Sequence, residues 1–316
     1  MNETEIIARF FRDLGARRGD VSTGIGDDAA VLAVPAGMEL VATTDTLVEG
    51  GHFVRGSAPQ SLGHRALAVN LSDIAAMGAR PAWALLSLVL PEADTAWLEA
   101  FARGFGTLAQ QHQVALVGGN LSRGPLSITV QLLGHVAAGC AVHRSGGQAG
   151  DLLCLTGSVG DAAAGLAVRS GKLQVANSAA LCQRFDYPTP RVALGAAMGG
   201  VASACIDISD GVGADLGRLA ASCGCGAELL VEQLPVSQEL REACGVRAWQ
   251  YALRGGEDYE LAIAVPPARL AALEQLARNC DTALAVVGRL RRGSGLECLQ
   301  AGRKLPAVEA GFDHFS

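Results

Sequence analysis

Apolar side chains recur along the chain in patterns that predict both helices and strands. Residues 3–14 carry them at helical spacing, and in residues 61–77 Leu67, Leu71 and Ile74 fall on one face of a predicted helix. A third helix is predicted over 95–111, capped by Asp94 or Thr95. Short apolar runs predict strands over 39–45, 83–90, 114–117 and 127–136.

The second half of the chain continues in the same mixed manner. Strands are predicted over 152–156, 204–208, 228–231, 261–265 and 283–287, and helices over 191–198, 214–222 and 268–278. Residues 172–186 are predicted to be a flexible connection. Strands and helices do not alternate strictly, which favours an α+β fold of two α/β domains over one doubly wound sheet. The turn-rich stretch at 145–150 predicts domains at 1–145 and 146–316.

Composition narrows the class of protein. A length of 316 residues suits two domains, and 50% hydrophobic with 18% charged residues is typical of a globular chain. The formal net charge of −6, without any basic run, argues against a nucleic-acid partner. The polar start is not that of a signal peptide, and no apolar run reaches the roughly 20 residues that span a membrane. The nine scattered cysteines favour reduced thiols in the cytoplasm.

Two adjacent acids, Asp27 and Asp28, lie on a glycine-bracketed turn within an apolar neighbourhood at 24–30. Unpaired buried charges are costly, so we expect a cation there, namely Mg²⁺ carrying phosphates. Gly24-x-Gly26-x-x-Ala29 also fits a loose dinucleotide-binding fingerprint. We reject that alternative because the two acids would repel a pyrophosphate and because residues 31–35 read as a strand and a turn.

Further acids fall where predicted elements end. Asp45 closes the strand over 39–45, after Thr43 and Thr44, and Asp73 shares a helix face with Asn70. The second half offers Asp207, Ser209 and Asp210, where its strand runs into a turn. One acidic turn in each half predicts a site in the cleft between the domains. This many acids suits several Mg²⁺ ions, although any single Asp could equally cap a turn or helix.

The chain lacks the usual lysine-based phosphate sites. It has only Lys172 and Lys304, and neither belongs to a P-loop. Phosphates must then be held by metal ions and backbone N–H groups. Joining two phosphate-bearing molecules needs bridging cations and no strong general base, because the acceptor oxygen is already anionic. The absence of a Ser-His-Asp or Cys-His constellation agrees with that reaction.

Three more residues are candidates with plain structural alternatives. His52 follows a turn, but a lone histidine is more often structural. Arg144 lies just before the domain boundary and can reach a phosphate, although an exposed arginine is usually only solvated. Glu257 stands on an acidic turn before a strand, where turn or cap chemistry is an equal explanation.

An ordered set of motifs resembles the thiamine-monophosphate kinase family over nearly the whole chain. The motifs are GIGDDAA, TTDTLVEGGHF, NLSDIAAMGA, VGGN, IDISDG, GGEDYEL and the terminal GFDHF. The resemblance implies an aminoimidazole ribonucleotide synthetase-like fold, with an N-terminal domain that forms a homodimer and a C-terminal α/β domain that closes the active-site cleft. It also implies transfer of the ATP γ-phosphate to thiamine monophosphate, giving thiamine diphosphate and ADP.

By motif position, the resemblance assigns roles to individual residues. It implies Mg²⁺ ligands at Asp28, Thr43, Thr44, Asp45, Asp73, Asp207 and Asp210, with Asp28, Asp45, Asp73 and Asp210 carrying catalysis. It implies ATP contacts at Gly119, Asn120, Arg144 and Ser209. It implies contacts to the thiamine phosphate at His52, Glu257 and Phe312. Asp27, next to a matched ligand, is interpreted as shaping its turn.

One position departs from the family pattern, and other functions stay open. The family commonly has Asp where this chain has Asn120, so an ion there should bind more weakly. Another ATP-using enzyme of the superfamily is an alternative. However, selenophosphate synthetase needs an N-terminal Cys or selenocysteine, whereas the first Cys is Cys140, and the hydrogenase-maturation type needs a C-terminal cysteine. A non-catalytic nucleotide or thiamine-phosphate binding protein is the alternative from a different class.

Overall fold

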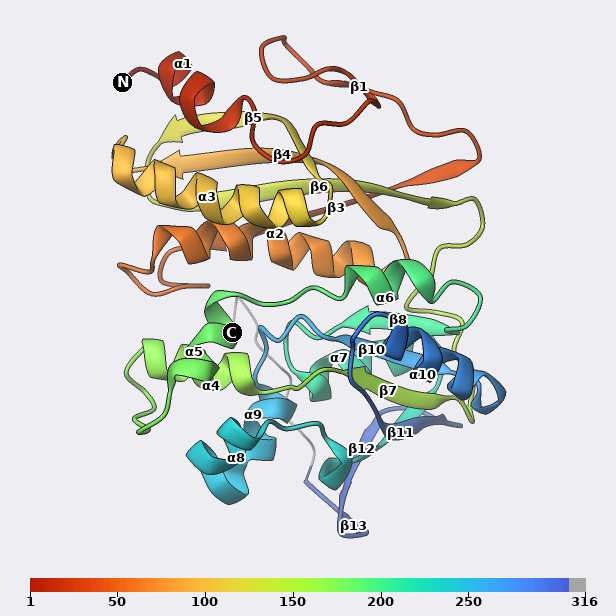
Figure 1. Ribbon diagram of the computed structural model, residues 1–316. Helices are drawn as coiled ribbons and strands as arrows, with labels where there is room; N and C mark the ends of the chain where they lie inside the picture. The colour runs from red at the N-terminus through yellow and green to blue at the C-terminus, as the bar shows by residue number, and fades with distance from the viewer. Residues whose placement is uncertain (307–316) are drawn as a thin grey trace. The chain divides into compact units, whose positions relative to one another are not determined.

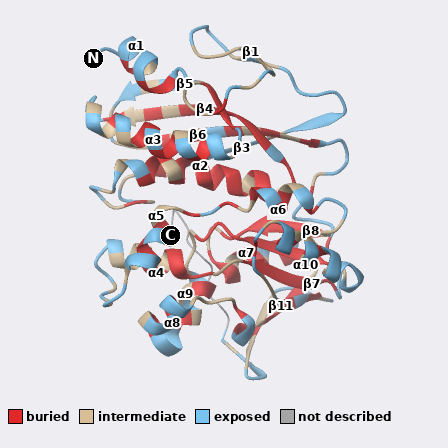
Figure 2. Cartoon of the chain, viewed as in Figure 1, coloured by how far each residue is buried: buried red, intermediate tan, exposed pale blue. Residues whose placement is uncertain are grey.

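The computed structural model describes residues 1–306, and the chain divides into two compact units. The first unit comprises Met1–Ile74 and Ala79–Gly139, and the second comprises Ala75–Gly78 and the chain from Cys140 onward. Each unit has its own sheet and its own buried apolar side chains (Figures 1 and 2).

The first unit combines a four-stranded sheet, a two-stranded ribbon and three helices (Figure 1). Its helices are α1 (Glu3–Ile6), which continues as the π-helical turn η1 (Ile7–Phe11), α2 (Pro59–Ala76) and α3 (Thr95–Gln111). Its strands are β1 (Val21–Thr23), β2 (Val31–Leu32), β3 (Met38–Val48), β4 (Arg80–Leu90), β5 (Ala115–Arg123) and β6 (Ser127–Ala137).

The sheet of the first unit has the order β3-β6-β4-β5, in which only β4 and β5 run parallel. Its two faces differ in burial. Along β6 the even-numbered residues are buried, with Ile128, Val130 and Leu132 at 0% exposure, whereas Gln131 is exposed. Leu67, Leu71 and Ile74 of α2 are also fully buried, as their spacing predicted. One face of the sheet is therefore packed beneath helices and the other is open.

The structure corrects the ends of several predicted elements in this unit. β3 continues to Val48, so Asp45 lies within the strand and not at its end. β5 likewise runs through the Gly118–Asn120 stretch to Arg123. The predicted cap of α3 is confirmed, because Asp94 Oδ1 accepts the N–H groups of Ala96 and Trp97.

The second unit is built on a seven-stranded sheet of order β13-β12-β9-β11-β7-β10-β8. Its strands are β7 (Leu152–Thr156), β8 (Ala204–Asp207), β9 (Gly226–Leu230), β10 (Leu261–Val265), β11 (Leu284–Arg291), β12 (Leu296–Gln300) and β13 (Arg303–Lys304). Its helices are α4 (Asp161–Arg169), α5 (Ala179–Asp186), α6 (Val192–Ala197), α7 (Val212–Ser222), α8 (Gln238–Cys244), α9 (Ala248–Arg254) and α10 (Leu270–Asn279). Short 3₁₀ turns occur at η2 (Val231–Gln233), η3 (Gly245–Arg247) and η4 (Pro267–Arg269).

Only β9 and β12 pair in parallel in this sheet, and its other pairings are antiparallel. The α+β interpretation is therefore confirmed for both units. The dinucleotide-binding alternative also fails on structure, because the 24–30 loop leads into the two-residue strand β2 and not into a helix.

One expectation about the second unit is wrong. The segment 172–186 is not simply a flexible connection, because its last eight residues form α5. One side of this helix is buried, and it consists of Leu181, Cys182 and Phe185. The elements α8, α9, β12 and β13 were not predicted from the sequence. The two helices are only seven residues long, β12 mixes charged and polar residues with apolar ones, and β13 is only two charged residues, so none gave a clear periodic signal.

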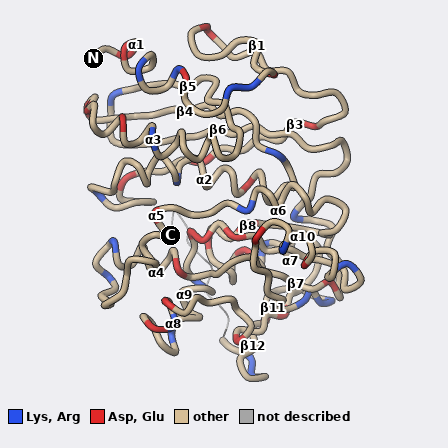
Figure 3. Tube along the Cα trace, viewed as in Figure 1, with Lys and Arg blue, Asp and Glu red and all other residues tan. Residues whose placement is uncertain are grey.

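Charged residues are scattered over both units (Figure 3). Among the described residues, none of the helices combines the length and the apolar character that crossing a bilayer requires.

Candidate active site

Three of the predicted ligands in the first unit belong to one face of its sheet. Thr43 Oγ1 donates a hydrogen bond of 2.6 Å to Asp73 Oδ2, which joins β3 to α2. The register of β3 and β6 pairs Thr43 with Leu132 and Asp45 with Val130, both of which are fully buried. Side chains alternate along a strand, so Thr43 and Asp45 share the helix-covered face with Asp73.

Thr44 does not join this group through its side chain. It pairs with Gln131, which belongs to the open face, and its Oγ1 donates to the carbonyl oxygen of Val130 at 3.1 Å. The hydroxyls of Thr43 and Thr44 therefore lie on opposite faces of the sheet, because neighbouring side chains on a strand alternate. That both residues are Mg²⁺ ligands stays a prediction.

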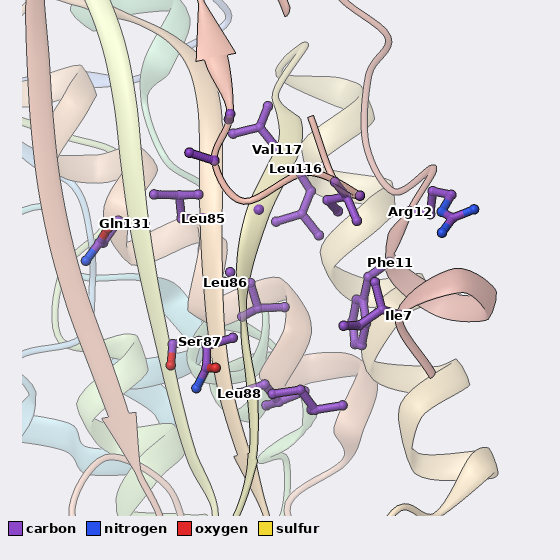
Figure 4. Close-up of a pocket in the computed structure, with 18 of the residues that line it drawn as sticks. Ile7, Phe11, Arg12, Leu85, Leu86, Ser87, Leu88, Leu116, Val117 and Gln131 are labelled. Atoms are coloured by element: carbon purple, nitrogen blue, oxygen red, sulfur yellow. The ribbon is translucent and has the colours of Figure 1, made fainter. Parts of the chain in front are cut away.

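The acidic turn at 24–30 lines a cavity of about 860 Å³ in the first unit. Apolar side chains of η1, β4 and β5 line it, among them Phe11, Leu86 and Leu116 (Figure 4). Asp27 and Asp28 are exposed, and the Asp28 N–H donates to Asp27 Oδ1 at 2.8 Å. The apolar neighbourhood is confirmed, but the expected burial of the two charges is wrong.

Asn120 reaches the same cavity from β5. It pairs with Ser87 of β4, and its Nδ2 donates to Ser122 Oγ at 2.9 Å. The preceding Gly119 has φ +150°, and a Cβ at that position would lie 1.9 Å from the carbonyl oxygen of Leu86. Only glycine fits that approach, which explains the glycine before Asn120 in physical terms.

The predicted ligands of the first unit thus form two groups. Thr43, Asp45 and Asp73 belong to the helix-covered face, whereas Asp28 and Asn120 line the cavity, where Asn120 shares a face with Ser87. Within residues 1–306, no three His, Cys, Asp or Glu side chains are grouped closely enough to hold a metal ion among themselves. The donor set nevertheless suits Mg²⁺, which typically takes one or two carboxylates and completes its shell with water and substrate phosphates.

His52 lies in the turn that follows β3. Its Nδ1 accepts the Val48 N–H at 3.1 Å, and its carbonyl oxygen accepts a hydrogen bond from Arg65 Nη1 at 3.1 Å. Because Nδ1 is an acceptor, a neutral His52 carries its proton on Nε2. The residue is half-buried, and these two contacts fix it in the turn.

The predicted acidic turn of the second unit follows β8 directly. Asp207 is buried at the end of that strand, opposite Leu261 of β10. The backbone N–H groups of Ser209 and Asp210 both donate to Asp215 Oδ2, at 3.1 and 2.9 Å. Burial raises the pKa of Asp215 to about 6, and the Asp210 N–H and Arg218 oppose that rise.

Arg218 is the charged partner of this turn. It forms an ion pair with Asp210 and a second, at 2.8 Å, with Asp215. Neither Asp215 nor Arg218 emerged from the sequence analysis. Their spacing of three residues on an amphipathic helix was the available signal, because i, i+3 partners share a helix face.

Glu257 reaches the same turn from the loop that precedes β10. Its N–H donates to the carbonyl oxygen of Ser209 at 2.9 Å, and a Cβ on Gly256 would lie 1.8 Å from that oxygen. Glu257 has φ +71°, and its Oε2 accepts the Tyr259 hydroxyl at 3.0 Å. The structure therefore brings Glu257 next to the Ser209–Asp210 turn, and the ligand roles of these three residues stay predictions.

A buried ion cluster stands at the end of the same loop and was also missed. Glu260 is fully buried, and Arg191 donates to both of its carboxylate oxygens at 2.6 Å. Arg184 of α5 donates to Glu260 Oε1 at 2.8 Å, and the Thr156 hydroxyl donates to Oε2 at 2.6 Å. The cluster attaches α5 and the start of α6 to the strands that carry the site.

The two remaining predicted residues stand apart from these contacts. Arg144 is exposed, and its carbonyl oxygen accepts a hydrogen bond from the Cys223 thiol at 3.2 Å. Phe312 lies outside the described residues. The expected cleft between the domains stays a prediction.

Comparison with known proteins identifies two matched domains. Residues 26–136 match the N-terminal domain of AIR synthase related proteins, and residues 148–298 match the C-terminal domain.

Relatives that match over nearly the full length are named thiamine-monophosphate kinase. The chain is 43% identical to the thiamine-monophosphate kinase of Salmonella typhimurium over 99% of this chain and 98% of that protein. The crystal structure of thiamine-monophosphate kinase from Stenotrophomonas maltophilia is 43% identical, with a TM-score of 0.86 over 96% of each chain. AaThiL complexed with AMPPCP and TMP is 35% identical, with a TM-score of 0.79 over 90% of this chain and 89% of that chain.

Proposed function

The chain belongs to the thiamine-monophosphate kinase family, and from that premise we propose that it transfers the γ-phosphate of ATP to thiamine monophosphate. The products are thiamine diphosphate and ADP. One observation supports the proposal most strongly. The chain is 43% identical to a thiamine-monophosphate kinase over nearly its full length, and it has acidic residues at the motif positions of that family. The similarity to AaThiL, which binds AMPPCP and TMP, supports the two substrates.

The assigned residues bind two anionic substrates, ATP and thiamine monophosphate, either directly or through Mg²⁺. The proposed Mg²⁺ ligands are Asp28, Thr43, Thr44, Asp45, Asp73, Asn120, Asp207 and Asp210. Bound Mg²⁺ would supply charge neutralisation between the two phosphate groups. Thr43 orients Asp73 through its 2.6 Å hydrogen bond, which fixes one carboxylate before any ligand arrives.

The remaining contacts bind the substrates. Backbone groups at Gly119, with Asn120, Arg144 and Ser209, contact ATP, since the chain has no P-loop lysine to do so. His52, Glu257 and Phe312 contact the thiamine phosphate. The protein acts in the cytoplasm, consistent with its many unpaired cysteines.

We also propose a homodimer formed through the first unit. The even-numbered side chains of β3 are all exposed, and they include Met38, Leu40 and Val48 at 39, 50 and 41% exposure. An edge strand that exposes a row of apolar side chains is a typical association surface. Light scattering should give twice the chain mass for the wild type and a monomer for Leu40→Glu.

A coupled assay of ADP release tests the activity. The purified protein should release ADP only when ATP, Mg²⁺ and thiamine monophosphate are all present, and thiamine diphosphate should appear in equal amount. Binding of both ligands without ADP release would favour the non-catalytic alternative. If ADP release did not depend on thiamine monophosphate but did depend on another phosphate acceptor, the protein would be a different enzyme of the superfamily.

A further inference from the structure

Asp215 is a carboxylate with 0% exposure whose partners are unusual for a helix residue. It lies in the first turn of α7, yet its Oδ2 accepts N–H groups from Ser209 and Asp210, which precede the helix. A helix cap normally bonds the N–H groups of the helix itself. Asp215 therefore holds the preceding turn in place, and not the helix end.

We propose that Asp215 is a positioning residue that fixes the Ser209–Asp210 turn for its ligands. The inference rests on the proposed function, in which Ser209 contacts ATP and Asp210 contacts Mg²⁺. A single buried carboxylate oxygen that accepts two consecutive N–H groups restrains the backbone of both residues. Small displacements at such contacts are costly to catalysis, about 100-fold for 1 Å.

Arg218 completes the arrangement on the other side of the turn. Its Nη1 lies 2.8 Å from Asp215 Oδ1 and also forms an ion pair with Asp210. The guanidinium therefore occupies the Asp210 carboxylate before a metal ion binds, and a divalent cation must compete with it. Asp215 fixes where this carboxylate is presented, and Arg218 sets how readily it accepts a cation.

The two residues predict opposite changes in Mg²⁺ dependence. Asp215→Leu removes the acceptor for both N–H groups, so kcat should fall about 100-fold and the half-saturating Mg²⁺ concentration should rise about tenfold. Arg218→Met removes the competing cation while Asp215 still holds the turn, so the half-saturating Mg²⁺ concentration should fall about threefold. If the two residues only stabilised the fold, their variants would not shift the half-saturating Mg²⁺ concentration in opposite directions.

Asp215→Asn guards against a folding failure. Its amide oxygen can still accept the two N–H groups, but its NH₂ group faces Arg218, so we expect a folded protein with a kcat about tenfold lower. Asp151→Asn is the matched control. Asp151 is also a buried carboxylate, accepting the Gln148 N–H at 3.0 Å and the Ser203 hydroxyl at 2.6 Å, but it precedes β7, at the opposite end of the sheet from Asp207.

The experiment measures ADP release against Mg²⁺ concentration in full-length wild type and the four variants, together with Mn²⁺ binding by electron paramagnetic resonance. The positioning role would be overturned if both Asp215 variants kept the wild-type kcat and Mg²⁺ dependence. It would also be overturned if Asp151→Asn lost as much kcat as the Asp215 variants. If the wild type releases no ADP, the proposed function fails on its own. Mn²⁺ binding then decides the inference: weaker binding by Asp215→Asn than by Asp151→Asn supports it, and equal binding overturns it.

Discussion

The two acidic turns of this chain are held in different ways. In the first unit, Asp27 and Asp28 are exposed on a loop that lines a cavity, and Asp27 accepts the N–H of its neighbour. In the second unit, the buried Asp215 and the loop at Glu257 both bond the backbone of the turn. The second turn is therefore built before ligands arrive, whereas we expect ligands to complete the environment of the first.

The largest expected effect concerns the carboxylates of the first unit. Asp45→Ala should lower turnover by roughly 1,000-fold, because an electrostatic contact to the reacting phosphates is lost. Measurement of ADP release at saturating ATP and Mg²⁺ checks this, with the exposed Asp13→Ala as the control. Activity within tenfold of wild type would refute the role of Asp45.

The largest effect on stability should come from the second unit. Glu260→Gln weakens a buried cluster with Arg184 and Arg191, and disrupting such a pair costs about 3–5 kcal/mol of unfolding free energy. Urea unfolding measures the loss. The matched control is Glu297→Gln, whose partner Lys304 is exposed and which should lose much less. Equal losses in the two variants would contradict the buried-cluster interpretation.

A smaller contrast separates the neighbouring threonines of β3. Thr43→Val removes the hydrogen bond that orients Asp73 and should lower kcat about tenfold. Thr44→Val removes only a contact to the Val130 carbonyl oxygen on the other face, so its kcat should change less. Steady-state kinetics at fixed Mg²⁺ compares the pair. The reverse order would show that Thr44, through its side chain, is the functional residue.

The smallest predicted effect concerns the departure at Asn120. Asn120→Asp restores the charge common in the family, so the half-saturating Mg²⁺ concentration should fall severalfold. Mg²⁺ titrations of wild type and variant give the comparison, with Ser122→Ala as a control for loss of the Asn120–Ser122 contact. No gain in metal affinity would count against a metal role at this position.

The sequence was most informative where periodic apolar patterns coincide with burial. The α2 face of Leu67, Leu71 and Ile74 was predicted because a packed helix must place its apolar side chains at that spacing. The extent of β3 was not, because its exposed Thr44 and Thr46 gave no hydrophobic signal for where the strand ends.

The site was partly predictable for a related physical reason. Acidic residues within motifs can be read directly from the sequence, so Asp73 and Asp210 were candidates before the structure placed them. The supporting residues Asp215 and Arg191 were not, because their partners are contributed by the tertiary fold: Arg191 and Glu260 are 69 residues apart.

A structure of the protein crystallised with Mg²⁺, a non-hydrolysable ATP analogue and thiamine monophosphate tests the central claim most directly. The account predicts Mg²⁺ ions bound to the triphosphate by Asp45 and Asp73 from one unit and by Asp207 and Asp210 from the other. A triphosphate bound elsewhere, with these four carboxylates away from every metal ion, would contradict it.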